Sequence, residues 1–388
     1  MIRIIDNFQP VTVLIPDDDN TLEIVKALRC LGQDPRFIVH VLSNVHSPAA
    51  RFSRYCKHLH HHSSRNDDEW LEAIESILRK FKIDVVLPVT LRGVQLISQK
   101  RDVISKVSAI PPLPEYELIE LVRNKWSLYQ FATQHGLPAV TSVFIGKGGE
   151  PISESADLDL IEYPALLKPT VQRGGFGIVK VDSPSHLEQA WKDKRIIKGS
   201  DYILQNYISG YDISFAVFSE SGKVIAYTLW KELLPCKESF RVPRLVEYTE
   251  DEQAVDVGRQ LVSAIGWNGV ADIDLIFDKR DKTMKILEIN PRFWLSLLGS
   301  LTAGVNFPLM SCLTAVGAEC PEMKQTRPVK YARPSASIRM LLSRLLGRKL
   351  ADGYSLRDSA IRFILKDPLP ELVYALRKSK KRFHRSSS

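Results

Sequence analysis

The chain has 388 residues, 44% hydrophobic and 25% charged, which excludes a disordered chain and suffices for two or three lobes around a buried core. No apolar run reaches the length of a membrane span, and the N-terminus lacks the features of a secretory signal. The five cysteines have no paired spacing, which indicates reduced thiols, so we expect a cytoplasmic protein.

The net charge of +8 is unevenly distributed along the chain. Residues 331–388 contain 14 Lys and Arg against 4 Asp and Glu, whereas the preceding 330 residues contain 39 against 41. This basic segment, with an amphipathic pattern at 339–350, could make weak contacts with an anionic membrane or a protein. Solvated or partner-packed helices are the simpler interpretation, and no nucleic-acid-binding motif accompanies the charge.

The first 110 residues alternate short apolar strands with helical patterns, which predicts a small parallel α/β lobe. We expect strands at 11–15, 36–43 and 84–90, and helices at 22–30, 67–81 and 92–107. The first strand ends in Pro16-Asp17-Asp18-Asp19, so a glycine-rich dinucleotide fingerprint is missing there.

Three prolines between 111 and 114 end that lobe, and helices near 116–122 and 124–135 follow. From Tyr163 the pattern predicts the strands of an antiparallel sheet, at 163–170, 177–181, 201–208, 212–219 and 223–230. A helix at 252–265 precedes a strand pair at 270–278 and 284–290, and the segment after 331 is helical in pattern.

A lysine and a glycine-bearing loop follow one another in KPTVQRGGFGIVKV, residues 168–181. Glycines at 174, 175 and 177 would let backbone amides approach a phosphate, and Lys168 could add a mobile cation. A tight hairpin is the commoner explanation of such a loop when it stands alone.

Oxygen-bearing side chains occupy the predicted strand pair. Glu288 and Asn290 lie two residues apart, so they share one face, and a short turn places Asp274 almost opposite Glu288. Magnesium prefers such ligands and would relieve the repulsion between the carboxylates. A solvated polar face is the alternative, and we expect Asp272 outside the ligand set.

Arg292 follows this strand pair after Pro291, and its guanidinium fork suits phosphate or acyl-phosphate oxygens. A structural salt bridge would explain it equally well. Four charged residues between the sheet and the helix at 252–265 could orient an acidic substrate, with surface charge as the alternative: Lys231, Glu232, Arg241 and Arg244.

The histidines at 58, 60, 61 and 62 could bind zinc or copper. We expect them on a loop, where adjacent residues rarely converge on one ion, so the sequence disfavours a metal site.

The complete ordered set of motifs resembles the ATP-grasp superfamily over about residues 1–320. The set comprises Asn124-Lys125, Lys168-Pro169, the loop at 174–177, ILQNYISGYD at 203–212, and Asp274, Glu288, Asn290 and Arg292. It is most similar to the carbamoyl-phosphate-synthetase-like and D-alanine–D-alanine-ligase-like branches. This resemblance implies an α/β chain with the α+β ATP-grasp fold.

The implied domains are a pre-ATP-grasp lobe at 1–112, an ATP-grasp domain at 113–325 and a basic helical C-terminal extension at 326–388. The ATP-grasp domain would divide into a small lobe at about 140–205 and a metal-binding lobe at about 206–325.

The resemblance also implies residue roles. Lys125 and Lys168 would contact the ATP phosphates beneath a lid formed by Gly174, Gly175 and Gly177. The backbone of Gln205, Asn206, Tyr207 and Ile208 would read adenine, and Asp212 would bind ribose. Asp274, Glu288 and Asn290 would hold magnesium or manganese, while Arg292 and Lys168 would act on the transferred phosphoryl group.

Two departures from the family pattern stand out. Gln205-Asn206 replaces a common glutamate, which puts a side-chain contact to adenine in question. Trp294-Leu295-Ser296 replaces a run of small residues, and its bulk could narrow the acceptor pocket.

The implied activity is that of an ATP- and magnesium-dependent ligase, which activates a carboxylate as an acyl phosphate and joins it to an amine or similar nucleophile. Two alternatives remain: a non-catalytic nucleotide-binding regulatory protein, or an interaction protein that acts through the basic segment. A homodimer is compatible with each of these readings.

Overall fold

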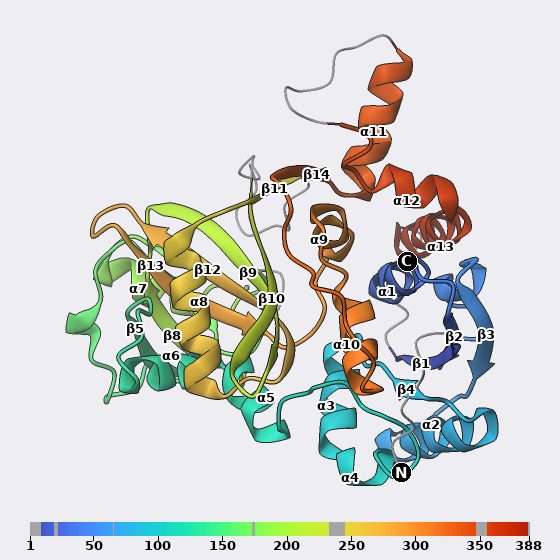
Figure 1. Ribbon diagram of the computed structural model, residues 1–388. Helices are drawn as coiled ribbons and strands as arrows, with labels where there is room; N and C mark the ends of the chain where they lie inside the picture. Colours follow the sequence, from blue (N-terminus) through green and yellow to red (C-terminus); the bar gives the residue numbers. More distant parts are fainter. Residues whose placement is uncertain are drawn as a thin grey trace.

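The computed structural model describes residues 9–18, 22–64, 66–172, 175–232, 245–346 and 355–386. Within these residues the chain builds a four-stranded parallel sheet, a four-stranded antiparallel sheet and a six-stranded antiparallel sheet, each accompanied by helices (Figure 1). This architecture confirms the predicted α/β class, with a parallel N-terminal lobe and two α+β lobes.

The N-terminal lobe has the sheet order β3-β2-β1-β4. Its strands are β1 (Val11–Asp17), β2 (Phe37–Ser43), β3 (Cys56–His61) and β4 (Val85–Val86). Its helices are α1 (Leu22–Leu31), α2 (Asp67–Phe81), α3 (Leu91–Gln99) and α4 (Arg101–Ile104), with a 3₁₀ turn at Ala49–Phe52. The expected strand at 84–90 is therefore only two residues long.

The histidine cluster lies mainly on β3, so its predicted place on a loop is wrong. β3 is a parallel edge strand paired with β2, and the ring centroids of His58 and His60 lie 4.4 and 5.2 Å from that of His40. His61 stacks on His46 instead, at 3.7 Å. Among the residues that the structure describes, no three or more His, Cys, Asp or Glu are arranged to hold a metal ion.

The small lobe contains the sheet β5-β8-β6-β7. Its strands are β5 (Ser142–Lys147), β6 (Ala165–Pro169), β7 (Val179–Val181) and β8 (Asp201–Asn206), with α7 (Pro184–Trp191) and a 3₁₀ turn at Leu158–Leu160. These strands run from Ser142 to Asn206, and the predicted lobe boundaries stay a prediction.

The large lobe is built on the sheet β13-β12-β9-β10-β11-β14. Its strands are β9 (Gly210–Glu220), β10 (Lys223–Glu232), β11 (Leu245–Thr249), β12 (Gly269–Asp278), β13 (Thr283–Asn290) and β14 (Val329–Ala332). One face packs against α5 (Tyr116–Arg123), α6 (Lys125–Gln134) and α8 (Glu252–Ile265). The opposite face packs against α9 (Leu297–Ala303) and α10 (Phe307–Ala315).

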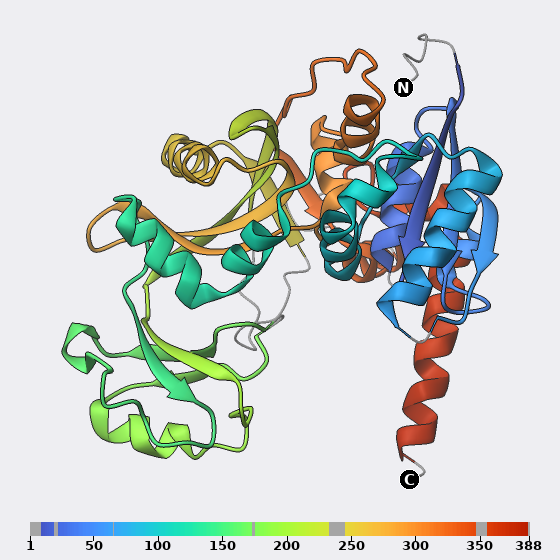
Figure 2. The same cartoon turned by 90° about the horizontal axis from the view of Figure 1, so that it is seen from below.

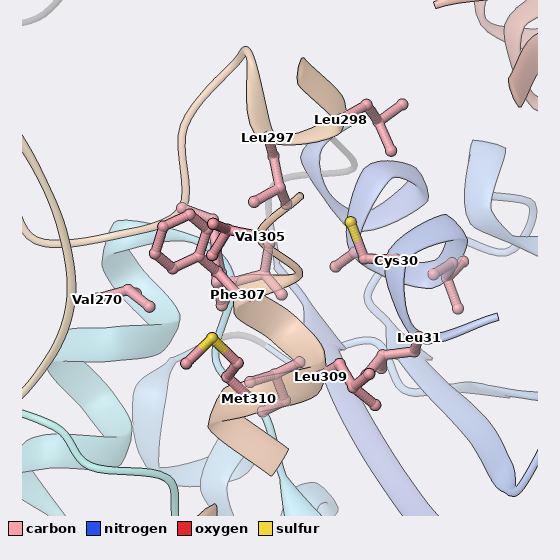
Figure 3. Close-up of a cluster of buried hydrophobic side chains, with 14 of the residues drawn as sticks. Cys30, Leu31, Val270, Leu297, Leu298, Val305, Phe307, Leu309 and Met310 are labelled. Carbon is pink, nitrogen blue, oxygen red and sulfur yellow. The ribbon is translucent and has the colours of Figure 1, made fainter. Parts of the chain in front are cut away.

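Helix α10 joins the large lobe to the N-terminal lobe. Phe307, Leu309 and Met310 are buried in one hydrophobic cluster with residues of α1 and α9 (Figure 3). Asn306 caps α10, and its side-chain amide donates to the carbonyl of Cys30 at 2.8 Å. In the described parts of the chain, no single helix is long and apolar enough to cross a membrane; the bent pair α9–α10 qualifies by length and composition alone.

The C-terminal segment is integrated into both neighbouring lobes. It contributes β14, which pairs with β11, and then forms α11 (Pro334–Leu345), α12 (Ile361–Lys366) and α13 (Leu369–Ser386). Arg29 of α1 binds the carboxylates of Asp367 and Glu371 at 3.1 and 2.6 Å, which fixes α13 beside the N-terminal lobe. Figure 2 shows α13 projecting from that lobe.

Candidate active site

The β12–β13 hairpin has the predicted register. Asp274 lies opposite Glu288 and Asp272 lies opposite Asn290. The Asn290 amide nitrogen lies 3.3 Å from a carboxylate oxygen of Asp274 and 3.4 Å from one of Glu288, so the three side chains converge. Ser214 on β9 donates to the other oxygen of Asp274 at 2.6 Å.

These carboxylates form a close acidic cluster in which Asp272 is buried and Asp274 and Glu288 are half-buried. Burial raises the pKa of Asp272 to about 7, and burial together with the neighbouring Asp272 and Glu288 raises the pKa of Asp274 well above its usual range. Burial opposes the ionised form of Glu288 too, but the ammonium of Lys125 holds its pKa at about 2. A divalent cation would favour the ionised form of these carboxylates, and the oxygen donors of Asp274, Glu288 and Asn290 are of the kind that magnesium prefers.

Lys125 is positioned by the start of α6. The Asn124 side chain caps this helix, accepting from the amide of Trp126 at 2.9 Å. The Lys125 amide donates to the carbonyl of Thr170 at 3.0 Å, and its ammonium lies 2.9 Å from Glu288. The cap therefore directs Lys125 between the β6 end and the β13 carboxylate.

Lys168 approaches the same region from the end of β6. Its ammonium donates to the side-chain oxygen of Gln205 at 2.7 Å, and Gln205 in turn donates to Ser142 at 2.9 Å. Burial and the neighbouring Lys125 lower the pKa of Lys168 to about 8. Because the Gln205 amide is neutral, Lys168 keeps a charge that an anionic ligand could neutralise.

The glycine loop is described from Gly175 onward, and Gly174 lies outside the described residues. Gly175 and Gly177 have φ angles of +75° and +79°. A Cβ on Gly177 would lie 3.0 Å from the Tyr202 hydroxyl, so local packing also requires glycine there. The lid role of this loop stays a prediction.

The segment predicted to bind adenine, residues 205–208, begins in the last two residues of β8 and continues beyond it. The Asn206 and Tyr207 amides already donate to the carbonyls of Thr141 and Pro164, both at 3.0 Å. Any backbone contact from Asn206 or Tyr207 to adenine would therefore use groups other than these amides, and the predicted roles of all four residues stay untested. Asp212 lies two residues before Ser214 on β9, so it faces the same side of the sheet.

A cavity of about 300 Å³ opens between these elements. Its walls come from α3, the α5–α6 junction, the loop after β6 and the end of β13: Leu91, Arg123, Lys125, Val171, Gln172, Glu288, Ile289, Asn290, Pro291 and Arg292. Arg292 donates to the carbonyl of Phe293 at 2.8 Å and approaches the side-chain oxygen of Asn290 at 3.4 Å. The structure shows no carboxylate partner for Arg292 among the residues that it describes, and the phosphate-binding role of Arg292 stays a prediction.

Sequence reasoning missed three side chains of this region. Ser214 could have been found from the alternation of polar and apolar residues on its strand, and Arg123 adjoins the Asn124-Lys125 motif. No sequence pattern indicates the place of Arg333, which is 9% exposed and lies 5.9 Å from the Trp230 ring. Its positive charge lowers the pKa of Asp272, in opposition to burial, which raises it.

The structure describes some of the other predicted contributors. Trp294 is 1% exposed and packs against Phe307 in the core, and the predicted effect of the Trp294–Ser296 segment on an acceptor pocket stays a prediction. Lys231 pairs with Glu247 at 3.5 Å. Arg241 and Arg244 fall outside the described residues.

Comparison with known proteins identifies a domain of this chain. Residues 122–296 match the model of an ATP-grasp domain, so this part of the chain is an ATP-grasp domain. The large chain of the arginine-specific carbamoyl phosphate synthase from Bacillus subtilis is 21% identical over 46% of this chain and 17% of its own length. A D-alanine–D-alanine ligase from Pseudomonas entomophila is 22% identical over 44% of this chain and 54% of its own length.

Most of the chain has solved counterparts in its fold. The N5-carboxyaminoimidazole synthetase from Staphylococcus aureus, complexed with ADP, superposes with a TM-score of 0.63 at 16% identity, covering 84% of this chain and 82% of that chain. This likeness confirms the ATP-grasp fold and extends it beyond the matched domain.

Proposed function

We propose, from the premise that residues 122–296 form an ATP-grasp domain, that this chain is an ATP- and magnesium-dependent ligase. It would activate a carboxylate as an acyl phosphate and join it to an amine or similar nucleophile. The supporting observation is the convergence of Lys125, Asp274, Glu288 and Asn290 beside Arg292 at one cavity.

In this proposal the two lysines bind the ATP phosphates. Lys125 holds Glu288 ionised and supplies a positive charge at the cavity wall. Lys168, oriented by Gln205, supplies a second cation nearby, since each lysine influences the other electrostatically. The backbone of Ile208 and the carboxylate of Asp212 are proposed for adenine and ribose, and Gly175 and Gly177 for the lid.

Asp274, Glu288 and Asn290 are the proposed magnesium ligands. When bound, the ion would neutralise charge on the phosphates and on the clustered carboxylates. Ser214 orients Asp274 by its 2.6 Å hydrogen bond, and Lys125 orients Glu288. These contacts fix the ligand positions before any nucleotide arrives.

Arg292 is the proposed stabiliser of the transferred phosphoryl group. Among the described residues its guanidinium donates to the Phe293 carbonyl and to the Asn290 side-chain oxygen, and it lines the cavity next to Asn290. Phosphoryl transfer needs positioning and neutralisation of spreading negative charge more than covalent help, and these side chains supply both. Exclusion of water by the glycine loop would protect the acyl phosphate from hydrolysis. The reaction would take place in the cytoplasm.

ADP release tests the proposal. The purified chain is incubated with ATP and magnesium, with and without manganese, against a panel of amino acids and small carboxylic acids. We expect one class of carboxylate to stimulate ADP release, and Glu288→Gln and Glu288→Ala to abolish that stimulation.

Asp281→Asn is the matched control, because it neutralises a carboxylate that pairs with Lys285 on the same hairpin, away from the cavity. This variant should keep full turnover. ATP binding without turnover under any acid would contradict the ligase assignment and favour the regulatory alternative. Equal turnover by Glu288→Ala and the parent chain would show that the activity arises elsewhere.

A further inference from the structure

The C-terminal helices expose an unusual amount of apolar surface. Among the described residues, fifteen large hydrophobic side chains are exposed, and eight of them lie between 338 and 376. We call these eight the C-terminal apolar surface: Ile338, Leu342, Leu345, Leu346, Leu365, Leu369, Leu372 and Leu376. Their exposed fractions run from 42% to 74%, and so many exposed apolar side chains on neighbouring helices of one segment indicate a binding function.

The leucines of α13 are held outward by the ion pairs on its other side. Glu371 and the preceding Asp367 bind the buried Arg29. With about 100° of rotation per residue, Leu369, Leu372 and Leu376 lie roughly 100° to 160° around the helix from Glu371. The anchored side therefore fixes which side faces away from the protein.

Helix α11 repeats this arrangement. Ser337 is buried and donates to the carbonyls of Ala332 and Arg333, and Leu341 packs against the core. Ile338, Leu342 and Leu345 lie roughly 80° to 140° around the helix from Ser337, and all three are exposed. Figure 1 shows α11 projecting beyond the sheets, and Figure 2 shows α13 doing so in another direction.

The positive charge of residues 331–388 favours one kind of partner over another. Residues 331–388 contain 14 Lys and Arg against 4 Asp and Glu, and the α13 sequence ends in RKSKKRFHRS. A second copy of the chain would bring two such positive segments together. An anionic lipid bilayer offers both an apolar layer for the leucines and negative headgroups for the basic residues.

We propose that the C-terminal apolar surface, together with the basic residues of the same segment, binds the surface of an anionic membrane. The leucines enter the boundary between headgroups and acyl chains, while lysines and arginines contact the headgroups. The three sheets stay in water. This attachment is independent of the proposed ligase activity.

Vesicle flotation with the full chain tests the proposal. Vesicles of phosphatidylcholine with about 30% phosphatidylglycerol are compared with pure phosphatidylcholine at low and high salt. We expect at least tenfold stronger binding to the anionic vesicles, weakened by salt because the headgroup contacts are electrostatic. The pair Leu372→Ser and Leu376→Ser should weaken binding at least tenfold.

Leu160→Ser is the matched control, since Leu160 is 55% exposed on the small lobe and Leu372 is 56% exposed. This control should bind like the parent chain. Binding that survives the α13 substitutions would refute lipid insertion and indicate a purely electrostatic contact. A concentration-dependent dimer that the same substitutions abolish, without vesicle binding, would assign the surface to a second copy and overturn the proposal.

Discussion

Replacing Arg29 by methionine should release α13 from the body of the protein. Arg29 is 1% exposed and binds three acceptors of the C-terminal segment: the Asp367 carboxylate at 3.1 Å, the Asp367 carbonyl at 2.6 Å and the Glu371 carboxylate at 2.6 Å. Methionine keeps the aliphatic stem but leaves both carboxylates without their cation.

The loss of the Arg29 cation affects the two carboxylates to different extents. The Asp367 side chain is 2% exposed but keeps bonds from the Ser53 hydroxyl and the Arg54 amide, both at 2.8 Å, whereas the Glu371 side chain is 15% exposed and can regain water. Breaking a buried pair from one side costs about 3–5 kcal/mol. Because Asp367 keeps two hydrogen bonds and Glu371 can regain water, we expect the substitution to cost about 3 kcal/mol, near the lower end of this range.

Hydrogen exchange and urea unfolding measure this cost. A loss of about 3 kcal/mol in local stability should accelerate amide exchange in α12 and the start of α13 by roughly 100-fold. Arg36→Met is the control: it removes a 2.6 Å pair with Asp34, but Arg36 is 36% exposed, so the expected cost stays below about 1 kcal/mol. Equal effects from both substitutions would refute the anchoring role of Arg29.

Three further predictions follow from the described contacts. Arg292→Lys should lower ADP release by about 10²–10³-fold with unchanged thermal stability, because a donor to the developing charge is lost; a fall in melting temperature would instead indicate a structural role. Gly177→Ala should cost about 1–3 kcal/mol in the free energy of unfolding, since it combines a φ of +79° with a 3.0 Å approach to the Tyr202 hydroxyl; a variant as stable as the parent would refute this strain. Burial, then His58 and His60, lowers the pKa of His40 from 6.5 to about 4. The unfolded chain therefore gains protons first on acidification, so stability should be complete above about pH 6.5 and fall toward pH 4, by at most about 3 kcal/mol. His40→Gln should flatten that dependence in urea titrations, and an unchanged slope would contradict the assignment.

The hairpin of the candidate site was predictable because its determinants are local. Period-2 alternation fixed the face of Glu288 and Asn290, and the short turn fixed the partner of Asp274. The same reasoning failed for β3, because histidines and lysines do not carry the apolar pattern of a strand. Its pairing with β2 comes from the parallel sheet rather than from local propensity.

The convergence of the two lysines was predictable only through family resemblance. Lys125 and Glu288 are 163 positions apart, and nothing local to either residue indicates their 2.9 Å contact. The Asn124 cap is visible in the sequence as the start of a helix, but where that helix sits against β13 is a property of the packed core.

Arg333 belongs to the predicted C-terminal extension, which begins at residue 326, yet it influences the carboxylates of the candidate site. Its burial depends on β14 pairing with β11, which joins residues 329–332 to 245–248 across the edge of the large sheet. Once β14 is in place, Arg333 reaches Trp230 and influences Asp272, whose pKa also depends on Arg292. In the sequence, Arg333 is one of many basic residues in the C-terminal segment. In the structure it is a buried cation close to the candidate ligands. Because a buried guanidinium needs an anionic or hydrogen-bonding partner, removing the C-terminal segment would disturb the electrostatics of the site as well as its attachment.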